Sequence, residues 1–279
     1  MKIKVTMDSA CDLTPELLAK YNIGVLPMTI VCAGREYKDG VDFTADDLFA
    51  RTEGGDACTT SAINVAEFEE FFGAILKEYD AIIHIDLSSE ISACHQNAVI
   101  AGADRPVYAV DSRSLSSGAG MLAVDAAIMA AEGLDAETIA AKLRELTAKI
   151  ETSFVIDSLK YLHRGGRCSS VAALGANILK LKPCIEMKNG KMDVGKKYRG
   201  SFDINILQYV RDKLQGREDI DYTRIFMTHA NGVSDETLEN VRKTILECGP
   251  FEEIHGPIAG CTISNHCGPV TLGILYHTK

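Results

Sequence analysis

Short apolar runs alternate with helical patterns along the first half of the chain. Strand-like apolar runs lie at 3–7, 23–31, 81–85 and 107–110, and helical spacings lie at 43–51, 65–77, 91–101, 115–131 and 136–150. Thr14 followed by Pro15 is a typical helix start, because threonine caps a helix and proline fits its first turn. Strands separated by helices predict parallel βαβ units, with ligands at the carboxyl ends of the strands.

The second half of the chain has a different pattern. Strand-like segments lie at 153–156, 179–187, 192–198, 225–229, 251–256, 259–264 and 270–276, with helical patterns only at 204–214 and 236–246. Asn189-Gly190 lies between two of these segments and is typical of a tight hairpin. In the first half, residues 35–37 are expected to pair back on 23–31 through Ala33-Gly34. We therefore predict an α/β fold of two domains, a mostly parallel βαβ domain at 1–152 and a mixed or antiparallel α+β domain at 153–279.

Gly118 and Gly120 belong to a candidate nucleotide-binding motif. The segment Gly118-Ala-Gly-Met-Leu-Ala123 matches a dinucleotide-binding fingerprint, but six residues separate it from Asp111 at the end of the preceding strand. The tight strand-to-helix turn of that fingerprint is therefore missing. We predict close helix packing at these glycines instead.

The net charge of the chain argues against some classes of binding partner. The chain has 29 basic and 39 acidic residues, a net charge of −10, and its longest basic cluster is Lys196-Lys197-Tyr198-Arg199. Nucleic acids and anionic membrane surfaces attract basic proteins, so neither is expected as a partner. No apolar window reaches the length of a transmembrane helix, so no stable membrane insertion is expected.

Nine cysteines do not form a recognisable framework. Their number is odd and no C-x-x-C occurs, so the common structural zinc patterns are absent. Cys32, Cys184 and Cys261 lie in apolar segments, where a free thiol behaves as a small hydrophobic group. The first residues read as a strand rather than a signal peptide. We expect free thiols, no metal site and a cytoplasmic location.

Three clusters of uncharged donors stand out as candidate binding groups. Residues 88–92 directly follow the strand-like run at 81–85, residues 59–61 precede a helical pattern at 64–77, and residues 262–269 follow another apolar run. Hydroxyls and free N–H groups at such positions can hold an anion without a salt bridge. Ser92 with His266 could also serve as a nucleophile and base from separate loops. The sequence nominates no orienting acid, and Ser92 could equally be a residue that satisfies backbone donors at a helix start.

Together these segments resemble the DegV family of bacterial fatty-acid-binding proteins. The resemblance spans nearly the whole chain in order. It rests on Asp8-Ser-Ala-Cys-Asp-Leu-Thr14, Thr60-Ser61, Ser88-Ser-Glu-Ile-Ser92, Asp111-Ser112, Ser158-Leu-Lys-Tyr-Leu-His-Arg-Gly-Gly-Arg167, Leu181-Lys-Pro183, Arg199, His229-Ala230 and His266-Cys-Gly-Pro269.

The resemblance implies a non-catalytic carrier with an acyl chain buried between two α/β domains. The bound long-chain fatty acid is then the ligand, and no cofactor is expected. Its carboxylate would meet Thr60, Ser61, Ser92, the backbone N–H of Ala93, and His266. Some members present the acyl group to a separate fatty-acid kinase, and Arg167 and Arg199 match arginines suited to that partner or its phosphate. The alternatives are an acyl hydrolase using Ser92 and His266, and a binding protein for another apolar anion.

Several positions depart from the family pattern. The usual Gln-Pro after Thr-Ser is Ala62-Ile63 here, the usual Ser-Gly-Thr-Tyr is residues 92–95 (Ser-Ala-Cys-His), and the final Gly-Pro-Gly ends in Val270. Ala93 matters most, because glycine permits a closer approach of the backbone than alanine. These departures bear on the geometry of the carboxylate site.

Overall fold

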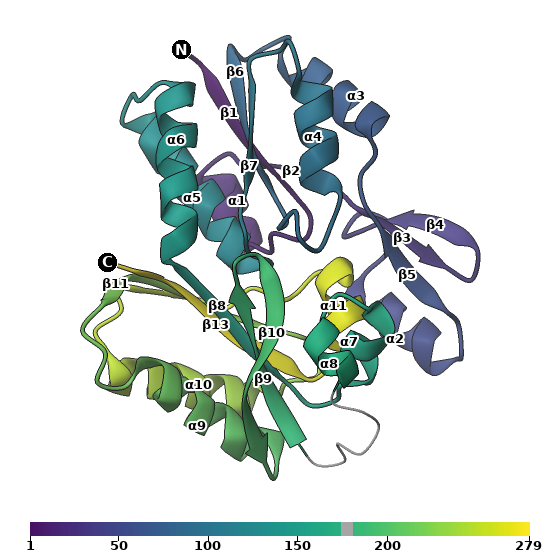
Figure 1. Ribbon diagram of the computed structural model, residues 1–279, viewed down its shortest axis with the longest axis vertical. Helices are drawn as coiled ribbons and strands as arrows, with labels where there is room; N and C mark the ends of the chain where they lie inside the picture. The colour runs from purple at the N-terminus through teal and green to yellow at the C-terminus, as the bar shows by residue number, and fades with distance from the viewer. Residues whose placement is uncertain (174–180) are drawn as a thin grey trace.

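A computed structural model describes residues 1–173 and 181–279, and three sheets organise them (Figure 1). The first sheet has the order β2-β1-β6-β7, with strands β1 (Ile3–Asp8), β2 (Gly24–Leu26), β6 (Ala81–Asp86) and β7 (Val107–Asp111). All its pairings are parallel, as the alternation of strands and helices predicts. None of the helices in the described ranges combines the length and apolarity needed to cross a bilayer.

Helices cover both faces of this parallel sheet (Figure 1). Successive strand residues point to opposite faces. Ile83 therefore packs in one core cluster with α5 and α6, whereas Ile82 packs in another with α3 and α4. The helices of this half are α1 (Pro15–Lys20), α2 (Ala45–Glu53), α3 (Val65–Ile75), α4 (Cys94–Gly102), α5 (Ser117–Ala131) and α6 (Ala136–Leu146), followed by the short 3-10 helix Thr147–Lys149.

The second sheet has six strands in the order β10-β9-β8-β13-β11-β12. Its strands are β8 (Ile150–Ile156), β9 (Leu181–Lys188), β10 (Lys191–Arg199), β11 (Ile220–His229), β12 (Glu253–His255) and β13 (Thr271–Thr278). Only β11 and β12 pair in parallel, so the predicted mixed sheet is confirmed. Asn189 and Gly190 turn between β9 and β10 with positive φ angles of 52° and 81°, which confirms the predicted hairpin. Residues 179 and 180 of the expected strand lie outside the described residues.

Helices of the second half lie around this sheet. They are α7 (Lys160–Gly165), α8 (Ser169–Ala173), α9 (Phe202–Leu214), α10 (Asp235–Cys248) and α11 (Cys261–Cys267). Helices α9 and α10 lie together on one side, where Tyr209 and Ile245 pack with Ile274 of the sheet. Helix α11 lies instead near α2, α7 and α8 (Figure 1). The expected strand at 259–264 is therefore wrong, since most of that segment begins this helix.

A third, small sheet has the order β4-β3-β5, with strands β3 (Thr29–Cys32), β4 (Arg35–Lys38) and β5 (Cys58–Ser61). The expected pairing of 35–37 through Ala33-Gly34 is confirmed, since β3 and β4 are antiparallel. The single strand expected at 23–31 is wrong, because β2 and β3 belong to different sheets. Pro27, which lacks an N–H for a strand ladder, lies at the break between them.

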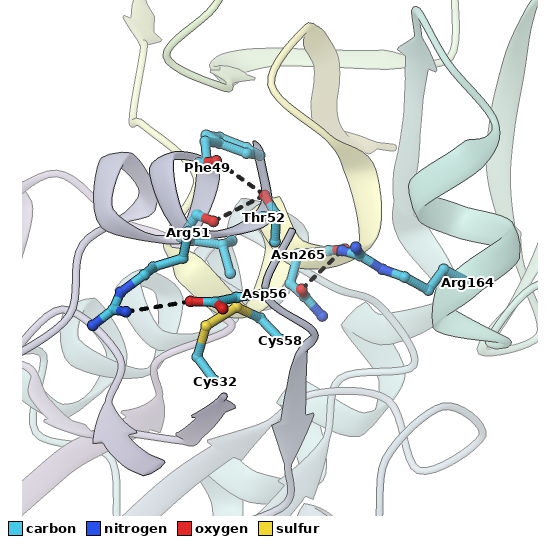
Figure 2. Close-up of a disulfide and its surroundings, with 9 residues drawn as sticks. Cys32, Phe49, Arg51, Thr52, Asp56, Cys58, Arg164 and Asn265 are labelled. Carbon is cyan, nitrogen blue, oxygen red and sulfur yellow. Dashed lines mark hydrogen bonds and ion pairs between the residues drawn. A yellow bond between two sulfur atoms is a disulfide. The ribbon is translucent and has the colours of Figure 1, made fainter. Parts of the chain in front are cut away.

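Two cysteines of the small sheet are joined by a disulfide (Figure 2). Cys32 of β3 and Cys58 of β5 are direct register partners, and their Cα atoms are 4.1 Å apart. The expected free thiol at Cys32 is therefore wrong, because a partner 26 positions away faces it across the sheet. Cys184 and Cys261 are free and buried, as expected.

Helix α5 lies between the two large sheets and is buried along most of its length. Gly118 makes this possible, because a Cβ there would lie 2.2 Å from Thr152 Oγ1 of β8. The predicted close packing at the glycine motif is thus confirmed. Phe226 of β11 and Leu275 of β13 belong to the same core cluster as Val5 of β1, so one core crosses between the two halves.

Candidate functional site

A cavity of about 720 Å³, including its open mouth, lies between the two halves of the chain. Its polar lining comes from Thr60, Ser92, Arg167, Thr262 and His266. The remaining lining is mostly apolar and consists of Met28, Ala62, Leu87, Ile91, Ala93, Leu115, Met192, Ile263 and Cys267. The cavity therefore combines an apolar wall with a cluster of uncharged donors and one guanidinium.

A second, much tighter pocket adjoins the first. The two share Leu115, Ile263 and Cys267, and the second reaches Phe154 of β8 and Leu275 of β13. Several hydroxyls line this second cavity, but their partners lie within the protein; Ser116, for example, donates to Asp12 over 2.6 Å. The two pockets therefore place apolar side chains between the polar cluster and the six-stranded sheet.

Thr60 and His266 meet although they are 206 residues apart. Thr60 Oγ1 on β5 lies 2.9 Å from Nε2 of His266 on α11. Neighbouring strand residues face opposite sides of a sheet, so Ser61 points away from Thr60. Ser61 is exposed and does not line the cavity. The structure thus brings Thr60 to the site and leaves Ser61 outside it.

His266 is held as a neutral imidazole. Burial, and to a lesser extent the nearby Arg167 and Arg164, lower its pKa to about 4. Its Nδ1 has no hydrogen-bond partner among the described residues and packs against Gly165, where a Cβ would lie only 2.1 Å away. A buried N–H without an acceptor is costly, so we assign the proton to Nε2. Nε2 then donates to Thr60, and the Thr60 hydroxyl proton remains free for a ligand.

Ser92 and Ala93 lie in the turn that leads into α4. Ser92 Oγ accepts the N–H of Cys94 over 3.2 Å, so part of its role is to satisfy a backbone donor, while its hydroxyl proton stays available. Ala93 is the N-cap residue of α4, and no side chain caps this helix from that position. Both residues line the cavity, so the helix start supplies donors there.

The two arginines occupy different places. Arg167 lines the cavity with Thr60 and His266, and its Nη1 donates to the carbonyl of Gly165 over 2.8 Å. Arg199 is exposed at the end of β10 and does not line the cavity. The site therefore contains Thr60, Ser92, Ala93, His266 and Arg167, but neither Ser61 nor Arg199.

Helix α11, which carries His266, is capped by the N-terminal half of the chain. Asp39 accepts the N–H groups of Cys261 and Thr262 over 2.9 and 3.0 Å. Asp12 accepts the N–H of Gly260 over 2.8 Å, and burial raises the pKa of this carboxyl to about 7. These two carboxylates satisfy the first donors of a helix that has no cap of its own.

The acidic residues at the strand ends contact groups other than His266, which argues against the hydrolase alternative. Asp8 accepts the N–H groups of Ala10 and Leu87, Asp86 lies 3.1 Å from His95, and Asp111 accepts the N–H and hydroxyl of Ser89. Burial and, to a lesser extent, the neighbouring Asp86 raise the pKa of Asp8 to about 6. Within the described ranges no carboxylate contacts Nδ1 of His266, so the orienting member of a catalytic triad is missing. Those ranges also hold no group of three or more ligating side chains suited to a metal ion.

Thr262 belongs to one of the donor clusters, but no sequence motif singles it out as a site residue. The structure places it in the cavity wall, one helical turn before His266. The spacing of four residues between Thr262 and His266 would place both on one face of a helix, but the apolar pattern of this segment predicts a strand.

Comparison with known proteins gives a consistent result. A model described as "Uncharacterised protein, DegV family" matches residues 2–279. A DegV domain-containing protein of Caldanaerobacter subterraneus is 32% identical over 281 residues, covering 100% of this chain and 99% of the relative.

Solved structures are similar over the whole chain. A DegV family protein from Thermus thermophilus described by its fatty acid binding has a TM-score of 0.87 at 28% identity, with 100% of both chains covered. DegV of Bacillus subtilis, described as a fatty acid binding protein, has a TM-score of 0.85 at 26% identity, again with 100% of both chains covered. By sequence and by architecture, this chain belongs to the DegV family.

Proposed function

We propose that this protein is a non-catalytic carrier that binds a long-chain fatty acid. The observation that carries the proposal is the cluster of Thr60, Ser92, Ala93 and His266 in a mostly apolar cavity that adjoins a second apolar pocket. The carboxylate is held by the two hydroxyls and the N–H of Ala93, with His266 orienting Thr60. The acyl chain extends past Leu115 between the two halves. The described fatty acid binding of the Thermus and Bacillus relatives supports this assignment.

The energetics fit an acyl ligand. Burying a methylene group is worth about 0.8 kcal/mol, so a long chain gains roughly 10–12 kcal/mol before the cost of ordering it. A carboxylate taken out of water without partners would cancel that gain. Each hydrogen bond to a charged group is worth about 1.5–3 kcal/mol, so several convergent donors are required. A neutral His266 suits this task, since its Nε2–H fixes Thr60 as a donor towards the ligand.

The second part of the proposal is that the carrier presents the carboxyl group of the bound fatty acid to a separate fatty-acid kinase, which forms an acyl-phosphate. Arg167 lines the same cavity as the donors, where its planar guanidinium can pair with phosphate oxygens. Arg199 is exposed outside the cavity and is assigned to contact with the kinase. This step needs the kinase and its nucleotide, because the donors of the cavity supply no phosphoryl group.

Native mass spectrometry of the protein purified from a bacterial host tests the carrier. We expect a mass increment of one intact fatty acid, which organic extraction releases unchanged. The acyl hydrolase predicts turnover of acyl esters that disappears in Ser92→Ala, and such turnover would refute the carrier. A different co-purified apolar anion would identify the third alternative, a binding protein for another ligand.

A further inference from the structure

The hydroxyl of Thr262 is buried without a hydrogen-bond partner in the described part of the chain. Thr262 is 3% exposed, and its Oγ1 contacts no donor or acceptor there. Buried hydroxyls normally find a partner, because the loss of water is otherwise uncompensated. The same residue lines the cavity that contains Thr60, Ser92 and His266. The cavity wall therefore contains a residue whose hydroxyl has no partner in the described ranges, and a ligand oxygen is the partner that this wall could receive.

The backbone of Thr262 is fixed by the other half of the protein. Its N–H donates to Asp39 over 3.0 Å, and Asp39 also accepts the Ser9 hydroxyl over 3.0 Å. Asp12 anchors the preceding Gly260 in the same way. Because these hydrogen bonds hold the first turn of α11, the Thr262 side chain is kept in the cavity wall before any ligand arrives.

Thr262 and His266 lie on one face of α11. Residues four positions apart are neighbours on a helix surface, and the rise between them is about 6 Å along the axis. Thr262 is therefore within a few atoms of the ligand's head group if that group contacts Thr60 and Ser92. We propose that the Thr262 hydroxyl donates a hydrogen bond to an oxygen at the carboxyl end of the acyl ligand. This inference rests on the proposed fatty-acid binding.

Two ligand oxygens could accept this bond. A carboxylate offers about four acceptor sites, and Thr60, Ser92 and the N–H of Ala93 supply three donors; with Arg167 assigned to phosphate, one acceptor site is left for a further donor. A hydroxyl on the second or third carbon of the chain is the other oxygen within reach. Both are oxygen acceptors at the same end of the ligand, and suitable ligands separate them.

The test replaces Thr262 by valine, which has nearly the same shape but no hydroxyl. Lipid-free Thr262→Val and the matched variant Thr59→Val are compared with the wild-type chain; Thr59 is exposed and does not line the cavity. Affinities for palmitate and 3-hydroxypalmitate are measured by displacement of a fluorescent fatty acid, and Tm is measured without lipid. We expect Thr262→Val to weaken binding about tenfold or more. We also expect its lipid-free Tm to rise by a few degrees, since an unpaired buried hydroxyl is removed.

Each outcome decides between these interpretations. Weaker palmitate binding assigns the bond to the carboxylate, and a loss confined to 3-hydroxypalmitate assigns it to the chain hydroxyl. Affinities equal to those of Thr59→Val for both ligands would overturn the proposal while fatty-acid binding stands. A fall in affinity accompanied by a fall in Tm would also overturn it, because the hydroxyl would then be structural. If the wild-type chain binds neither ligand, the proposed function itself fails and this inference fails with it.

Discussion

Replacing Thr60 by valine removes the hydroxyl that links His266 to the proposed carboxylate. In the structure Thr60 Oγ1 lies 2.9 Å from His266 Nε2, and that nitrogen supplies the proton because Nδ1 has no acceptor in the described ranges. The Thr60 hydroxyl therefore has one proton to give to a ligand. Losing a hydrogen bond to a charged group costs about 1.5–3 kcal/mol, which predicts about 10- to 150-fold weaker binding.

Displacement of a fluorescent fatty acid from lipid-free protein measures this loss. Thr59→Val is the matched control, since it makes the same chemical change one residue earlier on an exposed side chain. A fatty alcohol of equal length should show a smaller loss than the acid, because its head group is uncharged. If Thr60→Val and Thr59→Val bind the acid equally well, the head-group site is assigned to the wrong residue.

Four further changes test other parts of the structure. Ser92→Ala should weaken fatty-acid binding by a similar factor in the same assay while leaving the circular dichroism spectrum unchanged. Arg167→Ala should load fatty acid normally but give less acyl-phosphate with a cognate kinase; a joint fall in loading and Tm would make this arginine structural. As pH falls from 6.5 to 4, the unfolded chain protonates His266 before the folded one, since the folded pKa is about 4. The free energy of unfolding, measured by urea titration, should therefore fall between pH 7 and 4.5 by about 2–3 kcal/mol more in the wild type than in His266→Gln. Equal falls in the two proteins would contradict the assigned effect of burial. Gly118→Ala should destabilise by about 1–3 kcal/mol in urea, whereas Gly73→Ala in α3, whose nearest atom would be 3.8 Å away, should not.

Local patterns were sufficient for much of the fold. The parallel strands of the first half and the hairpin at Asn189-Gly190 follow from periodicity and turn chemistry, which act within a few residues. The break between β2 and β3 also has a local signal, which is Pro27 itself. The apolar residues on both sides of this proline nevertheless predict one continuous strand. The Cys32–Cys58 disulfide had none, because it depends on the register of β5 on β3.

Helix α11 shows why the site was only partly predictable. Its segment is apolar enough to read as a strand, and it becomes a helix whose first N–H groups are capped by Asp39 and Asp12, more than 200 positions away. Thr60, Ser92 and His266 could be nominated from their residue types and the family resemblance. Which of Thr60 and Ser61 faces the cavity depends on strand geometry, and the unpaired hydroxyl of Thr262 depends on the finished packing.

The position of β13 in the six-stranded sheet has a consequence for how the protein is made. This strand follows the other five in the sequence, yet it lies between β8 and β11. Synthesis proceeds from the N-terminus, so β8 and β11 leave the ribosome before the strand that must separate them. Until β13 arrives, both present unpaired edges, which are liable to pair wrongly. Because Leu275 of β13 also lines the second pocket, a nascent chain acquires the complete wall of that pocket only when this strand has inserted.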